Sequence, residues 1–169
     1  MARIPIALQL YSVREDCAND LPGTLKAVAD MGYEGVEFAG YHDRSADELR
    51  QMCDELKLAS VGTHTGIDTL LGDQLEETVK FNRTLGHKYL IVPGLAEEYR
   101  ATPDAWRQTA ATFNDIAAKA AALDAQVGYH NHRIEFEDLD GEIPWDIFCG
   151  GTTQSVITQL DVGHCMRGG

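Results

Sequence analysis

The sequence predicts an α/β protein in which about six strand-helix units form a parallel sheet covered by helices. Short apolar runs that suit buried strands alternate with stretches of helical periodicity. The connections have the length of helices, as crossovers between parallel strands require. Polar residues stand at the ends of most apolar runs, and in a (β/α) barrel such residues surround one mouth. A doubly wound sheet would usually carry a Gly-rich turn after its first strand, and LQLYSVRED has none. We therefore favour the barrel type.

The first half of the chain contains three strand-helix units. Asn19 or Asp20 can cap the first helix, which is expected to stop at a glycine. Ser45 and Glu48 have the spacing of a capping box, which predicts the start of the second helix. The expected strands are residues 4–10, 35–38 and 59–63, and the expected helices include residues 22–31 and 72–85.

The second half continues the alternation. Pro103 begins a long Ala-rich helix, expected to end at Leu123, whose apolar residues form one buried stripe. Strands are expected at 89–92, 127–129 and 156–161, and a short helix at 144–148. His87 lies in a turn and is expected to be solvated, and residues 165–166 are expected to be in a loop.

The stretch Gln126 to Asp138, QVGYHNHRIEFED, concentrates chemically active side chains. Because side chains alternate along a strand, His130 and His132 are expected to point the same way. Glu135 follows three residues later. Two imidazoles and a carboxylate at a strand exit could hold a divalent metal or move a proton, whereas an isolated histidine is usually a structural residue.

Other strands bring further polar residues toward the same expected interior. Glu37 is a charge inside an apolar strand, so it is expected either to bind substrate hydroxyls or to pair with an interior Arg or Lys. His64 ends the third strand, where it could line the mouth or make a core hydrogen bond. Asp161 is expected at the end of the sixth strand, which makes it a further candidate for a site residue.

Composition restricts the partners and the compartment. The net charge of −13 disfavours binding to nucleic acid or to an anionic membrane. No stretch suggests a membrane span or a convincing signal peptide. The widely spaced cysteines suggest reduced thiols, so we expect a cytoplasmic protein. We also expect a single domain over residues 1–169. The four cysteines are Cys17, Cys53, Cys149 and Cys165.

Four segments resemble the xylose isomerase-like TIM barrels, the sugar phosphate isomerase/epimerase superfamily. They are LQLYSVR, GVEF followed by Gly40-Tyr41-His42, YHNHRIEFE and LDVGH. The resemblance implies a (β/α)8 barrel that binds a divalent metal (Mn, Mg, Co or Zn) and a small sugar or sugar phosphate. It also implies isomerisation or epimerisation by proton transfer through a metal-bound enediolate.

The resemblance also suggests individual roles. Asp161 matches the metal ligand of the sixth strand, and His164 matches a position that commonly contacts substrate, a role also expected for Glu37 and His64. The fifth strand departs from the common pattern, because this chain has His130 where many members have Glu. Either His130 is the ligand, or Glu135 serves instead. We favour Glu135 in a catalytic or metal role, with His132 as a second catalytic candidate.

Length sets a further expectation. Barrels of this kind usually take about 250 residues or more, and this chain has 169. We therefore expect a partial barrel with two bare edge strands. These edges could pair with a second copy, exchange elements between chains or reduce solubility, unless the chain is a piece of a longer polypeptide; we favour a homo-oligomer. Two alternatives remain open: a metal-dependent lyase or hydrolase acting on keto-sugars or inositols with the same barrel, and a catalytically incompetent barrel fragment.

Overall fold

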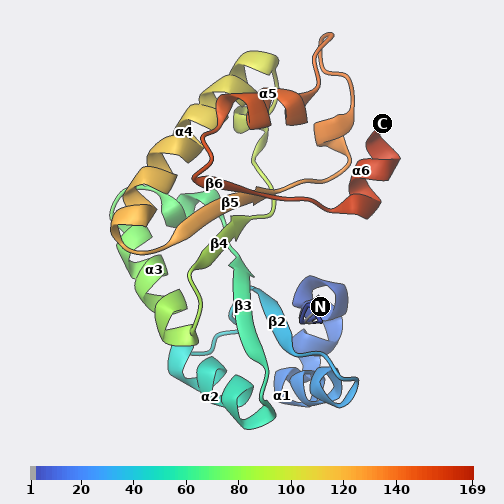
Figure 1. Ribbon diagram of the computed structural model, residues 1–169, viewed down its shortest axis with the longest axis vertical. Helices are drawn as coiled ribbons and strands as arrows, with labels where there is room; N and C mark the ends of the chain where they lie inside the picture. Colours follow the sequence, from blue (N-terminus) through green and yellow to red (C-terminus); the bar gives the residue numbers. More distant parts are fainter. Residues whose placement is uncertain (1–2) are drawn as a thin grey trace. The chain divides into compact units, whose positions relative to one another are not determined.

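The computed structural model describes residues 3–169. Its strands form one open, parallel six-stranded sheet in which β1 to β6 follow one another in chain order (Figure 1). The chain divides into two compact units. The first contains the described residues up to His64 together with Glu77–Tyr89, and the second contains Thr65–Glu76 and Leu90–Gly169. Within residues 3–169, no helix is long and apolar enough to cross a membrane.

The first unit contains three strands and the helices packed on them. Asp20 has non-helical backbone angles inside α1 and accepts a hydrogen bond from the Gly23 amide at 3.1 Å, so it caps the second part of this helix as predicted. The predicted capping box of Ser45 and Glu48 is present at the start of α2. The elements are β1 (Ala7–Gln9), η1 (Leu10–Val13), α1 (Arg14–Asp30), β2 (Gly35–Ala39), α2 (Ala46–Leu56), β3 (Ala59–His64) and most of α3 (Gln74–Leu85).

The core of this unit forms where α1 and α2 cover the strands. Leu25 of α1 and Leu49 of α2 are completely shielded from solvent, as are Val36 and Phe38 of β2. Burying side chains of this size contributes roughly 1.5–3 kcal/mol each. This packing fixes the position of β2, and with it the direction of Glu37, which lies between Val36 and Phe38.

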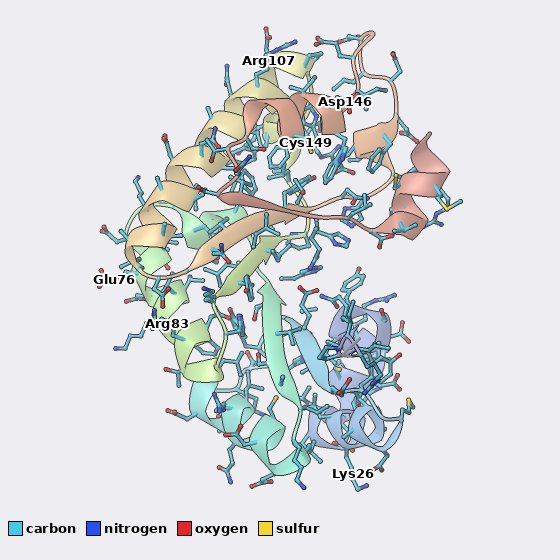
Figure 2. All side chains as sticks on the ribbon, viewed as in Figure 1. Lys26, Glu76, Arg83, Arg107, Asp146 and Cys149 are labelled. Atoms are coloured by element: carbon cyan, nitrogen blue, oxygen red, sulfur yellow. The ribbon has the colours of Figure 1, made fainter. Side chains whose placement is uncertain are left out.

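The second unit contains the strand ends that carry most of the predicted site. Its elements are η2 (Ile67–Leu70), β4 (Tyr89–Val92), η3 (Glu97–Tyr99), α4 (Pro103–Ala122), β5 (Gln126–His130), η4 (Ile134–Phe136), α5 (Pro144–Gly151), β6 (Val156–Gln159) and α6 (Val162–Gly168). In Figure 1, α4 and α5 lie side by side, which agrees with their extensive contacts. Figure 2 shows Arg107 on α4, and Asp146 and Cys149 on α5.

An aromatic cluster joins α4, β5 and α5. The Tyr129 ring of β5 packs edge-on against Trp106 and Phe113 of α4, with centroid distances of 5.9 and 5.8 Å, and Phe113 contacts Phe148 of α5 at 5.1 Å. All four rings are buried. Tyr129 therefore faces the helices, and alternation along β5 turns His130 to the opposite face of the strand.

The sequence predicted most of these elements, with two differences near the site. β5 ends at His130, so His132 lies beyond the strand, and β6 ends at Gln159. Asp161 is the N-cap of α6, and the residues 165–166 that were expected in a loop belong to this helix. The loop prediction was wrong because an N-cap aspartate followed by glycine and few apolar residues gives little helical signal.

Candidate functional site

In the first unit, Glu37 and His64 form a nearly buried pair. Glu37 Oε2 lies 3.3 Å from His64 Nε2, so a histidine is one partner of this carboxylate. The register of β2 against β3 shifts between Val36 and Glu37, which sets Glu37 opposite Gly62. A Cβ atom on Gly62 would lie 3.1 Å from Glu37 Oε1. The missing side chain therefore makes room for the carboxylate.

His87 is buried, and its predicted solvation is wrong. Its Nε2 lies 2.9 Å from Thr63 Oγ1, and its Nδ1 accepts from the Tyr89 amide at 3.3 Å. Because Nδ1 accepts, the neutral ring carries its proton on Nε2 and donates it to Thr63. Burial lowers the pKa of His87 to about 4, although the charge of Glu37 opposes that shift. His87 is thus a neutral structural residue.

In the second unit, Glu135 is buried and supports the turn after β5 through two hydrogen bonds. Its Oε1 accepts from the Tyr129 hydroxyl at 2.5 Å, and its Oε2 accepts from the His132 amide at 2.7 Å. Burial and the nearby Glu135 charge raise the pKa of Tyr129, so the phenol remains a donor. Both carboxylate oxygens are therefore used to hold the turn after β5, on the side of Tyr129.

His130 and Asp161 approach each other at the ends of β5 and β6. His130 Nδ1 lies 2.8 Å from the side-chain oxygen of Gln159, which pairs with His130 in the sheet register. A carbonyl oxygen only accepts, so the neutral ring carries its proton on Nδ1 and has a lone pair at Nε2. That Nε2 lies 3.8 Å from Asp161 Oδ2. When the ring is neutral, Nε2 and Oδ2 both carry lone pairs, and a cation between them would be favourable.

Asn131 fixes the backbone of Asp161. Its Oδ1 accepts from the Asp161 amide at 2.7 Å and its Nδ2 donates to the Asp161 carbonyl at 3.1 Å, while the Asn131 side chain is fully buried. Asp161 Oδ1 accepts from the His164 amide at 2.7 Å. This hydrogen bond, helped by the nearby histidines, lowers the pKa of Asp161. Oδ2 is consequently an ionised oxygen directed toward His130.

Three imidazoles follow one another along this edge. The His132 ring lies 5.3 Å from His130 and 4.9 Å from His164, centroid to centroid. His132 as a whole is half-buried. The second unit therefore brings together His130, His132, Asp161 and His164, with Glu135 behind them as a support.

The donor set of His130 and Asp161 fits a divalent cation as two of its ligands. An imidazole nitrogen and a carboxylate oxygen are usual ligands of Zn²⁺ and similar ions, and each of these two is oriented by a hydrogen bond from its other side. Among residues 3–169, no group of three or more His, Cys, Asp or Glu side chains is placed to hold an ion. Glu135 does not join the pair in this arrangement.

Asn131, Gln159 and Tyr129 were not predicted as site residues. Their contribution is to position other groups, and it depends on contacts across 6 to 30 positions in sequence. Gln159 carried a usable signal, since it is a polar residue at the end of an apolar strand. Asn131 stands between two histidines, and nothing in the sequence distinguishes a clamp on the next strand from an exposed amide.

Comparison with known proteins adds the fold family. No protein-family model and no curated protein sequence matches the chain. Two sugar phosphate isomerase/epimerase structures from Parabacteroides distasonis align with TM-scores of 0.84, at 21% and 25% identity. They cover 99% and 97% of this chain, which spans 68% and 71% of theirs. A "xylose isomerase-like TIM barrel/4-hydroxyphenylpyruvate dioxygenase fusion protein" aligns over 93% of this chain and 26% of its own, with a TM-score of 0.67 and 15% identity.

The chain has the fold of six strand-helix units of a xylose isomerase-like TIM barrel. This confirms the predicted fold class and the resemblance drawn from LQLYSVR, YHNHRIEFE and LDVGH. In barrels of this type the active site lies at the carboxyl ends of the strands. His130 and Asp161 stand at or just after the ends of β5 and β6, which is where this fold carries its chemistry.

Proposed function

We propose that this chain carries part of the active site of a divalent-metal-dependent sugar isomerase or epimerase. Structural similarity to sugar phosphate isomerase/epimerase proteins supports a sugar-modifying enzyme. The observation that carries the proposal is the approach of His130 Nε2 to Asp161 Oδ2, at 3.8 Å, on adjacent strand ends. These two side chains would hold the metal.

The bound ion would supply Lewis acidity, polarising a sugar carbonyl and acidifying the neighbouring C–H. The protein's own part is orientation and proton transfer. Gln159 holds the His130 ring in the tautomer that keeps Nε2 unprotonated, and Asn131 holds Asp161 at the end of β6. Groups that orient a ligand typically affect metal affinity or activity by roughly 10–100-fold.

His132 is the proton-transfer group in this proposal. Its ring lies beside that of His130, and an imidazole is a group suited to proton transfer near neutral pH. Glu135 has a positioning role, because its carboxylate binds the His132 amide from the buried side. The substrate-binding roles of Glu37, His64 and His164 stay predictions.

Deuterium exchange tests the proposal. The protein is incubated with Mn²⁺ and a panel of aldoses and ketoses in D₂O, and incorporation at the carbon next to the carbonyl is followed by NMR. We expect metal-dependent incorporation that is lost in Asp161→Asn and strongly reduced in His132→Gln. The matched control is Asp115→Asn, which makes the same change at an exposed position of α4 and should exchange normally.

Equal incorporation by the wild type and Asp161→Asn would contradict the assignment, as would the absence of metal-dependent exchange with every sugar tested. Release of a leaving group instead of simple exchange would favour the lyase alternative on the same scaffold.

A further inference from the structure

We infer that the cavity lined by Arg133, His164 and Arg167 binds an oxyanion, a phosphate or carboxylate group of the substrate, beside the proposed site. The cavity measures about 450 Å³, which lies within the usual range of ligand clefts. Its three lining residues are all basic. The assignment of the anion to the substrate rests on the proposed function, whereas the anion binding itself does not.

The charge of the cavity is opposite to that of the chain. The sequence has 27 acidic residues against 14 Lys and Arg, yet two arginines line this cavity. Guanidinium groups stay charged at every physiological pH and bind two oxygens of a carboxylate or a phosphate through paired N–H donors. Like charges that share a cavity repel each other, and a bound anion removes that cost.

His164 contributes a further donor. Its Nδ1 lies 3.2 Å from Arg167 Nη2, and a guanidinium can only donate, so Nδ1 accepts. The neutral His164 ring then carries its proton on Nε2. The same residue connects the cavity to the proposed site, since its amide binds Asp161 and its ring contacts His132.

Close packing of α6 on η4 brings the two arginines to the same cavity. A Cβ atom on Gly168 would lie only 2.4 Å from the Arg133 carbonyl oxygen and 2.7 Å from Phe136 Cβ. The absence of a side chain at Gly168 therefore permits the approach of Arg167, its neighbour, to the turn that carries Arg133. Arg133 also contacts Glu137 at 2.9 Å, an exposed ion pair that a bound anion would compete with.

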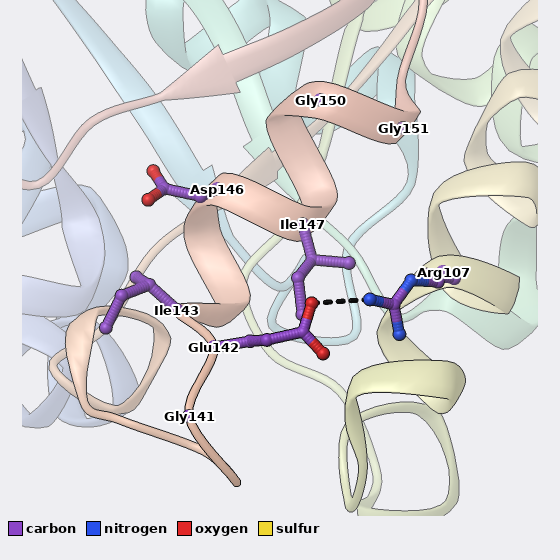
Figure 3. A pocket seen from close by; sticks show the side chains of 8 residues that line it. All are labelled: Arg107, Gly141, Glu142, Ile143, Asp146, Ile147, Gly150 and Gly151. Atoms are coloured by element: carbon purple, nitrogen blue, oxygen red, sulfur yellow. Dashed lines mark hydrogen bonds and ion pairs between the residues drawn. The ribbon is translucent and has the colours of Figure 1, made fainter.

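A second arginine-lined cavity gives the contrast. Arg107 lines it, but Glu142 lies 2.5 Å from the guanidinium, as Figure 3 shows. Asp104 lies 3.0 Å from the same guanidinium. Asp146 adds another carboxylate to the lining. This cavity is neutralised from within, so we expect it to have no affinity for anions, and Arg107 serves as the matched control.

The test is calorimetric titration of the metal-free protein with inorganic phosphate and with acetate. Removing a charge-assisted contact should weaken binding roughly tenfold or more, so Arg167→Gln and Arg133→Gln should each raise the dissociation constant by that factor. Arg107→Gln should leave it unchanged. Glu137→Gln should tighten binding, because it frees Arg133, and circular dichroism confirms that each variant is folded.

Glucose, glucose 6-phosphate and glucuronate then distinguish the sources of the anion. Tighter binding of the phosphate ester, lost in Arg167→Gln, assigns the site to a sugar phosphate, whereas the same result for glucuronate assigns it to a sugar acid. Absence of saturable anion binding, or identical affinities in Arg167→Gln and Arg107→Gln, would overturn the inference. Loss of deuterium exchange with anion binding intact would instead refute the proposed reaction alone.

Discussion

Replacing Asn131 by Leu removes the clamp between the ends of β5 and β6 while keeping the branching and the number of heavy atoms of the side chain. Two hydrogen bonds are lost, at 2.7 and 3.1 Å, and the backbone amide and carbonyl of Asp161 lose their partner. An unsatisfied buried polar group costs about 1–3 kcal/mol. Because Asp161 is only partly buried, water recovers some of this loss. We expect a total destabilisation of roughly 2–4 kcal/mol.

Asn114 provides an unusually close control. Its side chain also makes two hydrogen bonds to backbone, donating to the Gly151 carbonyl at 2.9 Å and accepting from the Thr153 amide at 2.8 Å. Gly151 and Thr153 are exposed, so water can replace the lost partner. Asn114→Leu should therefore cost less than about 1 kcal/mol.

The assay is urea unfolding of the wild type and both variants, followed by Mn²⁺ titration of the folded proteins. Asn131→Leu should lower the free energy of unfolding with an unchanged urea slope, and should weaken Mn²⁺ binding roughly tenfold or more. Asn114→Leu should leave Mn²⁺ binding unaltered. Equal stability losses in the two variants, together with unchanged Mn²⁺ affinity in Asn131→Leu, would refute the reasoning.

Three other predictions address the surrounding structure. Glu135→Gln places an NH₂ donor opposite either the Tyr129 hydroxyl or the His132 amide, which are both donors. The free energy of unfolding in urea should therefore fall by roughly 1–3 kcal/mol. An unchanged value would contradict a supporting role for Glu135. His87 has a folded pKa of about 4 against an ordinary 6.5, so the unfolded chain takes up a proton first as pH falls. The contribution of neutral His87 to the free energy of unfolding should be fully present above pH 6.5 and should fall by roughly 3 kcal/mol toward pH 4. This decline should be absent in His87→Gln. Gly128→Ala places a Cβ about 2.5 Å from the Ile157 carbonyl, so thermal unfolding should show a large loss of stability, and a wild-type midpoint would show that β5 and β6 can separate without cost.

Local sequence signals predicted the framework well. The capping box joins Ser45 to Glu48 and the Asp20 cap joins Asp20 to Gly23, so each acts over three positions, and both are present. The strand expected at 127–129 is present as β5, which extends to His130. Such features depend on neighbours in the chain, so the sequence is sufficient to find them.

Features that depend on distant contacts were harder to predict. His87 is buried because Thr63, 24 positions away, accepts its proton, and a turn sequence does not reveal that contact. Glu135 has the residue type of a metal ligand, but its oxygens are taken by Tyr129 and the His132 amide. Asp161 became a site candidate because its expected place at a strand end agreed with the family resemblance, whereas its role as the cap of α6 came from the structure.

Mn²⁺ binding by calorimetry, on the wild type, His130→Phe and Asp161→Asn, tests the central claim most directly. The account predicts one ion per wild-type chain and loss of that binding in both variants, because each removes one of the two side chains that face each other at 3.8 Å. Asp115→Asn should bind as the wild type does. An unchanged Mn²⁺ dissociation constant in His130→Phe or Asp161→Asn would contradict the account.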